Sequence, residues 1–216
     1  MPAAVSSEKP AAPTGLRERK RELVQRLLLD TALGLFASRG YSAVTVEHIV
    51  QEAGVSRSTF FRYFDTKDAV LFHHSAQALD DMLADFAARR RAGTGRRTAL
   101  RQAILAASVP FEEQRDYFRL LHRLMEQDRS LRLSYAENNR AITNRVAGLY
   151  LADTADPGSA LAGRVEAAAL WSASLVAMET WIDMEGVDLH TLTREAFAAL
   201  DRPADDAGRR DAGGRG

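Results

Sequence analysis

The chain contains no cysteine among its 216 residues. Disulfide bonds, cysteine nucleophiles and cysteine-ligated zinc are therefore excluded, and the composition suits a reducing compartment. No apolar run approaches the roughly 20 residues that a membrane-spanning helix needs, and the N-terminal residues lack the basic and apolar regions of a secretory signal. We therefore expect a cytoplasmic protein with no membrane partner.

An excess of charge of either sign is also absent, because 29 Lys and Arg residues balance 29 Asp and Glu residues. A strongly basic chain would have pointed to nucleic acid. A DNA-binding protein needs only one basic face, however, and a cluster of five basic residues lies ahead of the central motif of the chain. These residues are Arg17, Arg19, Lys20, Arg21 and Arg26. A frayed, solvated helix end explains the same cluster equally well.

The residue patterns that catalysis, metal binding or cofactor binding require are missing too. Residues 40–44 (Gly-Tyr-Ser-Ala-Val) match a nucleophile elbow except for the final valine, and they follow a predicted helix instead of a strand. Residues 93–95 (Gly-Thr-Gly) form a linker, because a phosphate-binding loop needs a preceding strand and a third glycine. The adjacent His73 and His74 point about 100° apart on a helix and do not chelate one ion together. We predict no enzyme, no catalytic residue, no metal site and no cofactor.

Helical periodicity is present, most clearly over residues 45–67. Thr45 is a suitable N-cap for a short amphipathic helix, and Gly54 suits the left-handed C-cap at its end. Ser56 then caps a second short helix. Two short helices joined by a tight glycine-bearing turn form a helix-turn-helix, which places its second helix in the DNA major groove. From periodicity alone, an ordinary helical hairpin with a solvated face is an equal alternative.

The second short helix has a core face and an outer face. Phe60 and Phe64 are four residues apart and can face the same core as Val55. The remaining positions are polar, basic or aromatic, and in a helix-turn-helix the positions near the N-terminus reach base edges. They are Arg57, Ser58, Thr59, Phe61, Arg62 and Tyr63.

Residues 28–71 closely resemble the N-terminal DNA-binding domain of the TetR family of bacterial transcriptional regulators. The matching positions are residues 30–37, 39–41, 45–46, 49, 53–56, 59–60, 63–64 and 66–68. Phe61 stands where the family usually has a tyrosine that hydrogen-bonds a phosphate, so its contact with DNA would be apolar, for example with a thymine methyl group. Members with a Phe-Phe-Arg-Tyr-Phe run, such as the mycofactocin-system regulators, resemble this variant.

The resemblance implies an all-α fold with an N-terminal three-helix helix-turn-helix domain and a larger C-terminal helical domain for ligand binding and dimerisation. We expect the first domain over residues 16–66 and the second over residues 67–200. Residues 1–15 and 201–216, poor in apolar side chains, are expected to be disordered. The implied function is that of a homodimeric repressor that binds a palindromic operator in double-stranded DNA and is released by a small-molecule effector.

Individual DNA contacts follow from the same resemblance. We expect Arg57 to read guanine through two hydrogen bonds, with Ser58 and Thr59 beside it. Thr45, Tyr63 and Lys67 are expected to contact phosphates, which positions a protein without reading sequence. The complete predicted DNA-binding set is Thr45, Ser56, Arg57, Ser58, Thr59, Phe61, Arg62, Tyr63 and Lys67.

The C-terminal part is helical in pattern throughout, and one of its helices is distinctive. Asp156 and Pro157 open this helix as an N-cap and a first-turn proline, and Gly186 follows its end. Residues 167–178 within it are apolar nearly all round, which indicates burial on several sides. In the resembled family the last two long helices pair with their copies in a second subunit. A central core helix within one subunit is the alternative.

An effector pocket is implied by the family architecture and not by a motif. The residues predicted to line it are Tyr117, Phe118, His122, Trp171 and Met178. Aromatic and Met side chains at helical spacing are also ordinary core residues, which is the competing interpretation of this set. A mostly apolar lining favours a hydrophobic effector. The alternative function is that of a helical dimer that acts through a protein partner, or of an activator without small-molecule induction.

Overall fold

The computed structural model describes residues 14–152 and 156–202, and every regular element within those ranges is helical. The predicted all-α fold is therefore confirmed. The regions expected to be disordered, residues 1–15 and 201–216, lie outside the described ranges except for residues 14–15 and 201–202. The chain divides into two compact units, Met1–Leu71 and Phe72–Gly216.

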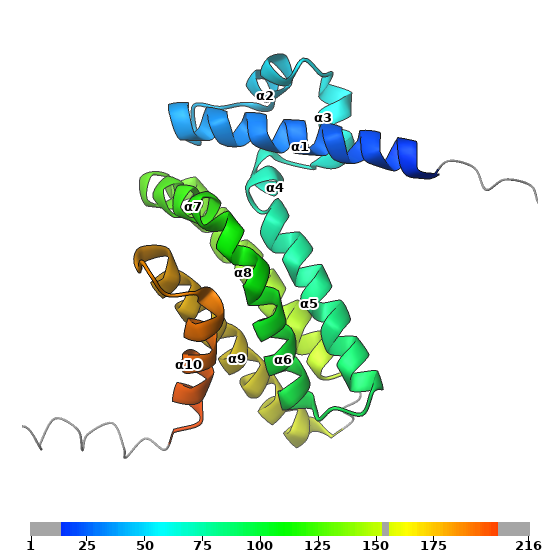
Figure 1. Cartoon of the computed structure of the whole chain (residues 1–216), viewed down its shortest axis with the longest axis vertical. Coiled ribbons are helices and arrows are strands. Elements are labelled where there is room, and N and C mark those ends of the chain that lie inside the picture. Colours follow the sequence, from blue (N-terminus) through cyan, green and yellow to red (C-terminus); the bar gives the residue numbers. More distant parts are fainter. Residues whose placement is uncertain (1–13, 153–155, 203–216) are drawn as a thin grey trace, which may run out of the picture. The chain divides into compact units, whose positions relative to one another are not determined.

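The described part of the N-terminal unit contains four helices, in which α1 packs against α2 and α4, and α2 packs against α3 (Figure 1). Their bounds are α1 Thr14–Arg39, α2 Val46–Ala53, α3 Arg57–Tyr63 and α4 Lys67–Leu71. Phe36 of α1, Ile49 of α2 and Phe60 of α3 are fully buried. The unit therefore has the predicted three-helix arrangement, with α4 added, and the domain bounds 16–66 stay a prediction.

The predicted caps of the helix-turn-helix are confirmed. The Thr45 hydroxyl accepts a hydrogen bond from the His48 backbone N–H (3.3 Å), and the Ser56 hydroxyl accepts one from the Thr59 N–H (3.1 Å). Gly54 adopts the left-handed conformation (φ 66°, ψ 31°), which residues with a Cβ rarely adopt. These local interactions set the start and the end of α2 and the start of α3.

The C-terminal unit is a helical bundle in which α9 packs against α8 and α10, and α5 packs against α6 (Figure 1). Its elements are α5 His73–Arg91, α6 Arg96–Ser108, the 3-10 helix η1 Val109–Gln114, α7 Arg115–Gln127, α8 Arg129–Tyr150, α9 Pro157–Asp183 and α10 Leu189–Leu200. Asp156 caps α9 through the Ser159 N–H (2.8 Å), as the sequence predicts. Leu170, Trp181 and Phe197 are fully buried in this unit.

Helix α9 is the exception to the expectation that no segment of the chain is long and apolar enough to span a membrane. It has 27 residues and a window of mean hydropathy 1.2, so by length and composition it passes that test, as core helices of soluble proteins also do. Nor is it buried on all sides within one chain. Leu161, Val165 and Val176 are 67%, 62% and 58% exposed and follow one side of the helix.

Candidate DNA interface and ligand cavity

Arg57, at the start of α3, is the most constrained of the predicted base-reading residues. Its guanidinium forms an ion pair with the Glu47 carboxylate of α2 (2.7 Å) and lies over the Phe61 ring, 5.3 Å from the ring centroid. A hydrogen bond from the Glu47 backbone N–H, together with the Arg57 charge, lowers the pKa of the Glu47 carboxyl. Both side chains remain largely exposed. The guanidinium is thus oriented by two neighbours while it faces solvent.

The hydroxyl groups beside Arg57 form a small cluster. The Ser56 Oγ lies 2.9 Å from the Ser58 Oγ and 2.8 Å from the Thr59 Oγ1. Ser56 and Ser58 are exposed, and Thr59 is half-buried. A hydroxyl can donate one hydrogen bond and accept two, so members of this cluster retain capacity for an external partner.

The remaining predicted contacts differ in accessibility. Phe61 is 41% exposed, Arg62 and Thr45 are exposed, and Tyr63 is half-buried.

The Lys67 ammonium group donates hydrogen bonds to the carbonyls of Tyr41 and Val44, both at 3.0 Å. It also lies over the Tyr41 ring, 3.9 Å from the centroid. Lys67 therefore fastens the turn before α2 to the start of α4, and its phosphate contact stays a prediction.

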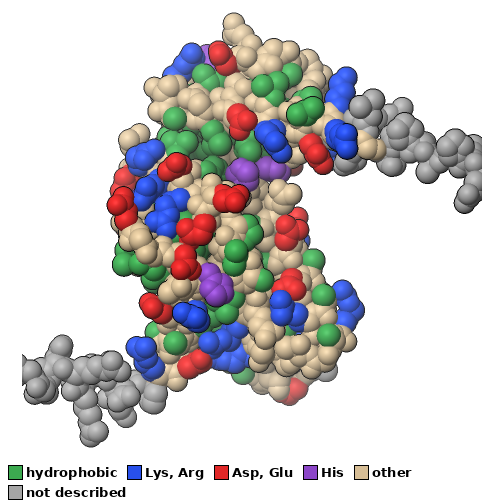
Figure 2. Space-filling model, in the orientation of Figure 1, with side chains coloured by type: hydrophobic (Ala, Val, Ile, Leu, Met, Phe, Trp, Pro, Cys, Tyr) green, Lys and Arg blue, Asp and Glu red, His purple; other side chains and the backbone are tan. Residues whose placement is uncertain are grey.

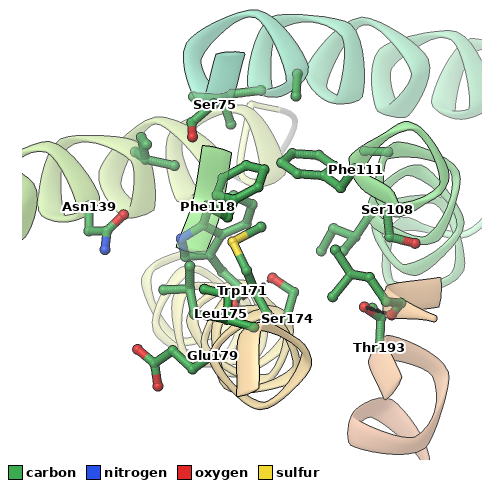
Figure 3. A pocket seen from close by; sticks show the side chains of 18 of the residues that line it. Ser75, Ser108, Phe111, Phe118, Asn139, Trp171, Ser174, Leu175, Glu179 and Thr193 are labelled. Carbon is green, nitrogen blue, oxygen red and sulfur yellow. Dashed lines mark hydrogen bonds between the residues drawn. The ribbon is translucent and has the colours of Figure 1, made fainter. Parts of the chain in front are cut away.

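A cavity of about 170 Å³ lies within the C-terminal unit, lined by residues of α5, α6, η1, α7, α8, α9 and α10 (Figure 3). Phe118, His122, Trp171 and Met178, four of the five residues predicted to contact an effector, line this cavity. Tyr117 does not line it. Its ring packs instead against His74 and Phe118, with centroid distances of 5.0 and 4.9 Å. Binding of an effector by these residues stays a prediction.

Most of the cavity wall is apolar, and several of its polar groups are already hydrogen-bonded. The hydroxyls of Ser108, Ser174 and Thr193 donate to backbone carbonyls of their own helices at 2.7–2.8 Å. The indole N–H of Trp171 is buried without a hydrogen-bond partner among the described residues. An unpaired buried donor of this kind costs about 1–3 kcal/mol.

Sequence reasoning missed the polar residues of the lining. They are Ser75, Ser108, Tyr135, Asn138, Asn139, Ser174, Glu179 and Thr193. Burial raises the pKa of the Tyr135 phenol, and the nearby Glu179 carboxylate adds to that rise. A polar residue on an amphipathic helix is ordinarily solvated, so the sequence carries no signal that these side chains meet around one space.

Charge and potential metal ligands are dispersed. On the face shown in Figure 2, Lys and Arg side chains are interspersed with Asp and Glu along the C-terminal unit. Within residues 14–152 and 156–202, no group of three or more His, Asp or Glu side chains is placed to hold a metal ion. The arrangement suits binding, with an exposed basic and hydroxyl-bearing helix in one unit and an apolar cavity in the other.

Two family descriptions match the chain. Residues 28–73 match "Bacterial regulatory proteins, tetR family", and residues 94–205 match the "MftR C-terminal domain". The first match covers the helix-turn-helix, and the second includes α6, η1, α7, α8, α9 and α10.

Individual proteins are similar over most of the chain. MftR of Mycobacterium tuberculosis, named for the transcriptional regulation of mycofactocin biosynthesis, is 30% identical over 196 residues, which is 85% of this chain and 94% of that protein. The transcriptional regulator TcmR of Streptomyces glaucescens is 28% identical over 194 residues, which is 87% of this chain and 85% of that protein.

Solved structures share the fold. NalD, a repressor of a multidrug efflux pump in Pseudomonas aeruginosa, has a TM-score of 0.55 at 20% identity, covering 83% of this chain and 95% of NalD. FadR of Thermus thermophilus, a repressor in complex with lauroyl-CoA, has a TM-score of 0.51 at 21% identity, covering 82% of this chain and 92% of FadR.

Proposed function

This chain belongs to the TetR family of bacterial regulatory proteins and carries an MftR-type C-terminal domain, and from that premise we propose that it is a homodimeric repressor that binds a palindromic operator. A small hydrophobic ligand that enters the C-terminal cavity releases it from DNA. A regulator of transcription acts where the chromosome is, so we place the protein in the bacterial cytoplasm.

The exposed face of α3 is the observation that carries this proposal. Arg57 and Ser58 stand at the N-terminal end of that helix, the part that reaches base edges when a helix-turn-helix binds DNA. An oriented guanidinium suits the two parallel acceptors of guanine in the major groove. Arg57 is the residue to which we assign direct base recognition.

The exposed side of α9 supports the homodimer. Leu161, Val165 and Val176 would leave water on pairing with a second copy, and a symmetric pair presents the same patch from both subunits. Two copies of α3 related by a two-fold axis require two half-sites in DNA. The palindromic operator follows from the proposed dimer.

Release by a ligand requires differential affinity. A ligand that binds the DNA-bound and free forms equally shifts nothing, so the effector must bind the DNA-free form more tightly. The apolar cavity in the C-terminal unit is the site we assign to it. Repressor relatives of the same fold, one of them bound to lauroyl-CoA, support this assignment.

The test is selection of bound sequences from a random duplex pool at physiological salt. Wild type, Arg57→Ala and Arg62→Ala are selected in parallel, because both variants remove one guanidinium from the same helix. Wild type should enrich a palindromic site. Arg57→Ala should lose information at a defined position in each half-site, at about 1–3 kcal/mol of discrimination. Arg62→Ala should weaken binding and keep the same site.

Two outcomes would count against the proposal. If wild type enriches no sequence, the exposed face of α3 does not read DNA. If Arg57→Ala and wild type enrich identical sites with equal information, base recognition belongs to other residues.

A further inference from the structure

The two ends of the cavity in the C-terminal unit differ chemically. Ser108 and Thr193 are 5% and 1% exposed, and their hydroxyl protons are bonded to their own helices. Glu179 is exposed, and Asn138 and Asn139 are half-buried. Figure 3 shows Glu179 and Asn139 on one side of Trp171, with Ser108 and Thr193 across the apolar middle. The cavity therefore has an inner end with buried hydroxyls and a mouth with more exposed polar groups.

The charge at the mouth has one sign. The lining contains no Lys or Arg and a single carboxylate, that of Glu179. The other titratable groups of the lining are the Tyr135 phenol and the His122 imidazole, and the His122 Nε2 lies 3.6 Å from a Glu126 carboxylate oxygen. An anionic head group placed here would lose its hydration without gaining a permanent cation as partner.

Aromatic side chains complete the binding environment. Trp171, Tyr135, Phe118 and Phe111 all line the cavity. The face of an aromatic ring attracts a cation, and quaternary ammonium ligands are recognised in this way. A carboxylate together with aromatic rings is a combination that favours a positively charged head group.

We propose that the cavity binds a cationic amphiphile, with its apolar part at the inner end between Ser108, Thr193 and Trp171 and its ammonium-type group at the mouth beside Glu179. That this molecule is the ligand that releases the protein from DNA rests on the proposed function. Its binding to the cavity does not. The volume sets the size of the apolar part. A cavity of about 150 Å³ holds benzene, so the roughly 170 Å³ here holds a ring or a short alkyl chain.

Three probes with one octyl chain test the charge preference. Octylammonium, octanol and octanoate are titrated into the full-length protein by calorimetry, without DNA and below their micelle-forming concentrations. Octylammonium should bind on the order of tenfold more tightly than octanol, the combined effect of an ion pair at the mouth and contact with aromatic rings. Octanoate should bind more weakly than octanol.

A substitution at the mouth isolates Glu179. Glu179→Gln should bring the affinity for octylammonium down to that for octanol and leave octanol binding unchanged. Glu137→Gln is the matched control, because Glu137 is an exposed carboxylate of α8 that does not line the cavity. It should behave as wild type with all three probes.

The inference is overturned if octanoate binds as tightly as octylammonium, if no octyl compound binds, or if Glu179→Gln keeps the cation preference. Failure of the proposed function gives a different result. Octylammonium would then bind with the expected preference and leave the affinity for the selected operator unchanged.

Discussion

The Glu47 carboxylate beside Arg57 has two opposite effects on the proposed DNA-binding surface. The ion pair with Glu47 orients the guanidinium, yet Glu47 also brings a negative charge to the surface that we propose contacts phosphates. Exposed ion pairs contribute little to stability, so we attribute no structural role to this one. If Arg57 reads base edges as proposed, the ion pair holds its flexible side chain in one place before DNA binds, which reduces the entropy lost on binding.

Glu47→Gln should therefore separate affinity from specificity. The variant should bind a scrambled duplex on the order of threefold more tightly, because a negative charge near the phosphates is lost. Its ratio of operator affinity to scrambled-duplex affinity should fall, because Arg57 is no longer held. Both affinities are measured by fluorescence anisotropy.

Glu52→Gln is the matched control, because Glu52 is exposed on the same helix. It should raise the affinity for both duplexes and keep their ratio. A Glu47→Gln ratio equal to that of wild type would show that the ion pair does not position Arg57 on DNA.

The sequence did not predict the hydrogen bonds that the Lys67 side chain makes within the N-terminal unit. Its charge and its place at the start of α4 suggest a phosphate contact, which depends on local sequence alone. The carbonyls that receive its hydrogen bonds belong to Tyr41 and Val44, which lie 26 and 23 residues earlier in the chain. Only the folded arrangement brings them together, so this role of Lys67 was beyond sequence reasoning.

At the scale of helices, the local sequence is enough to predict the residues that cap several helix N-termini. Thr45, Ser56 and Asp156 are predicted caps, and each accepts a hydrogen bond from a backbone N–H in the following turn. Each of these hydrogen bonds joins residues three positions apart, so the local sequence is enough to predict it. The polar mouth of the cavity joins residues of α8 and α9 that are 40 positions apart in sequence, such as Asn139 and Glu179, and no local pattern predicts it.

The glycine between α2 and α3 gives a prediction at the scale of an element. Gly54 has φ 66°, and a Cβ there would meet no atom within 4 Å, so the whole effect of Gly54→Ala is conformational. We expect a loss of about 1–2 kcal/mol in the free energy of unfolding, measured by urea denaturation. The cost arises because alanine disfavours the left-handed conformation that ends α2.

Gly34→Ala provides the opposite case. Gly34 is exposed inside α1, and a Cβ there also meets no atom within 4 Å. Alanine in a helix interior should raise the free energy of unfolding by about 0.5–1 kcal/mol. Changes of the same sign in both variants would contradict the assignment of Gly54 to a left-handed cap.

For the whole molecule, the exposed side of α9 makes the subunit count testable. Val165→Asp with Val176→Asp places two charges on that side, and a charge buried without a partner is strongly unfavourable. We expect sedimentation as a monomer with unchanged helical circular dichroism, and loss of tight operator binding. Val109→Asp, an exposed apolar position in η1, is the control that should stay dimeric. A double variant that remains dimeric would locate the interface elsewhere.

The residue at which the two units join has a consequence for the whole molecule. Phe72 follows the last residue of α4 and precedes α5, and its ring lies 6.0 Å from the Tyr135 ring, centroid to centroid. Tyr135 lines the cavity, so one side chain separates the cavity from the joining residue. If a ligand acts through this pair, thermodynamic reciprocity requires operator DNA to weaken ligand binding by the same factor by which the ligand weakens DNA binding. In a cell, the number of operator copies would then set part of the ligand concentration at which the regulator responds.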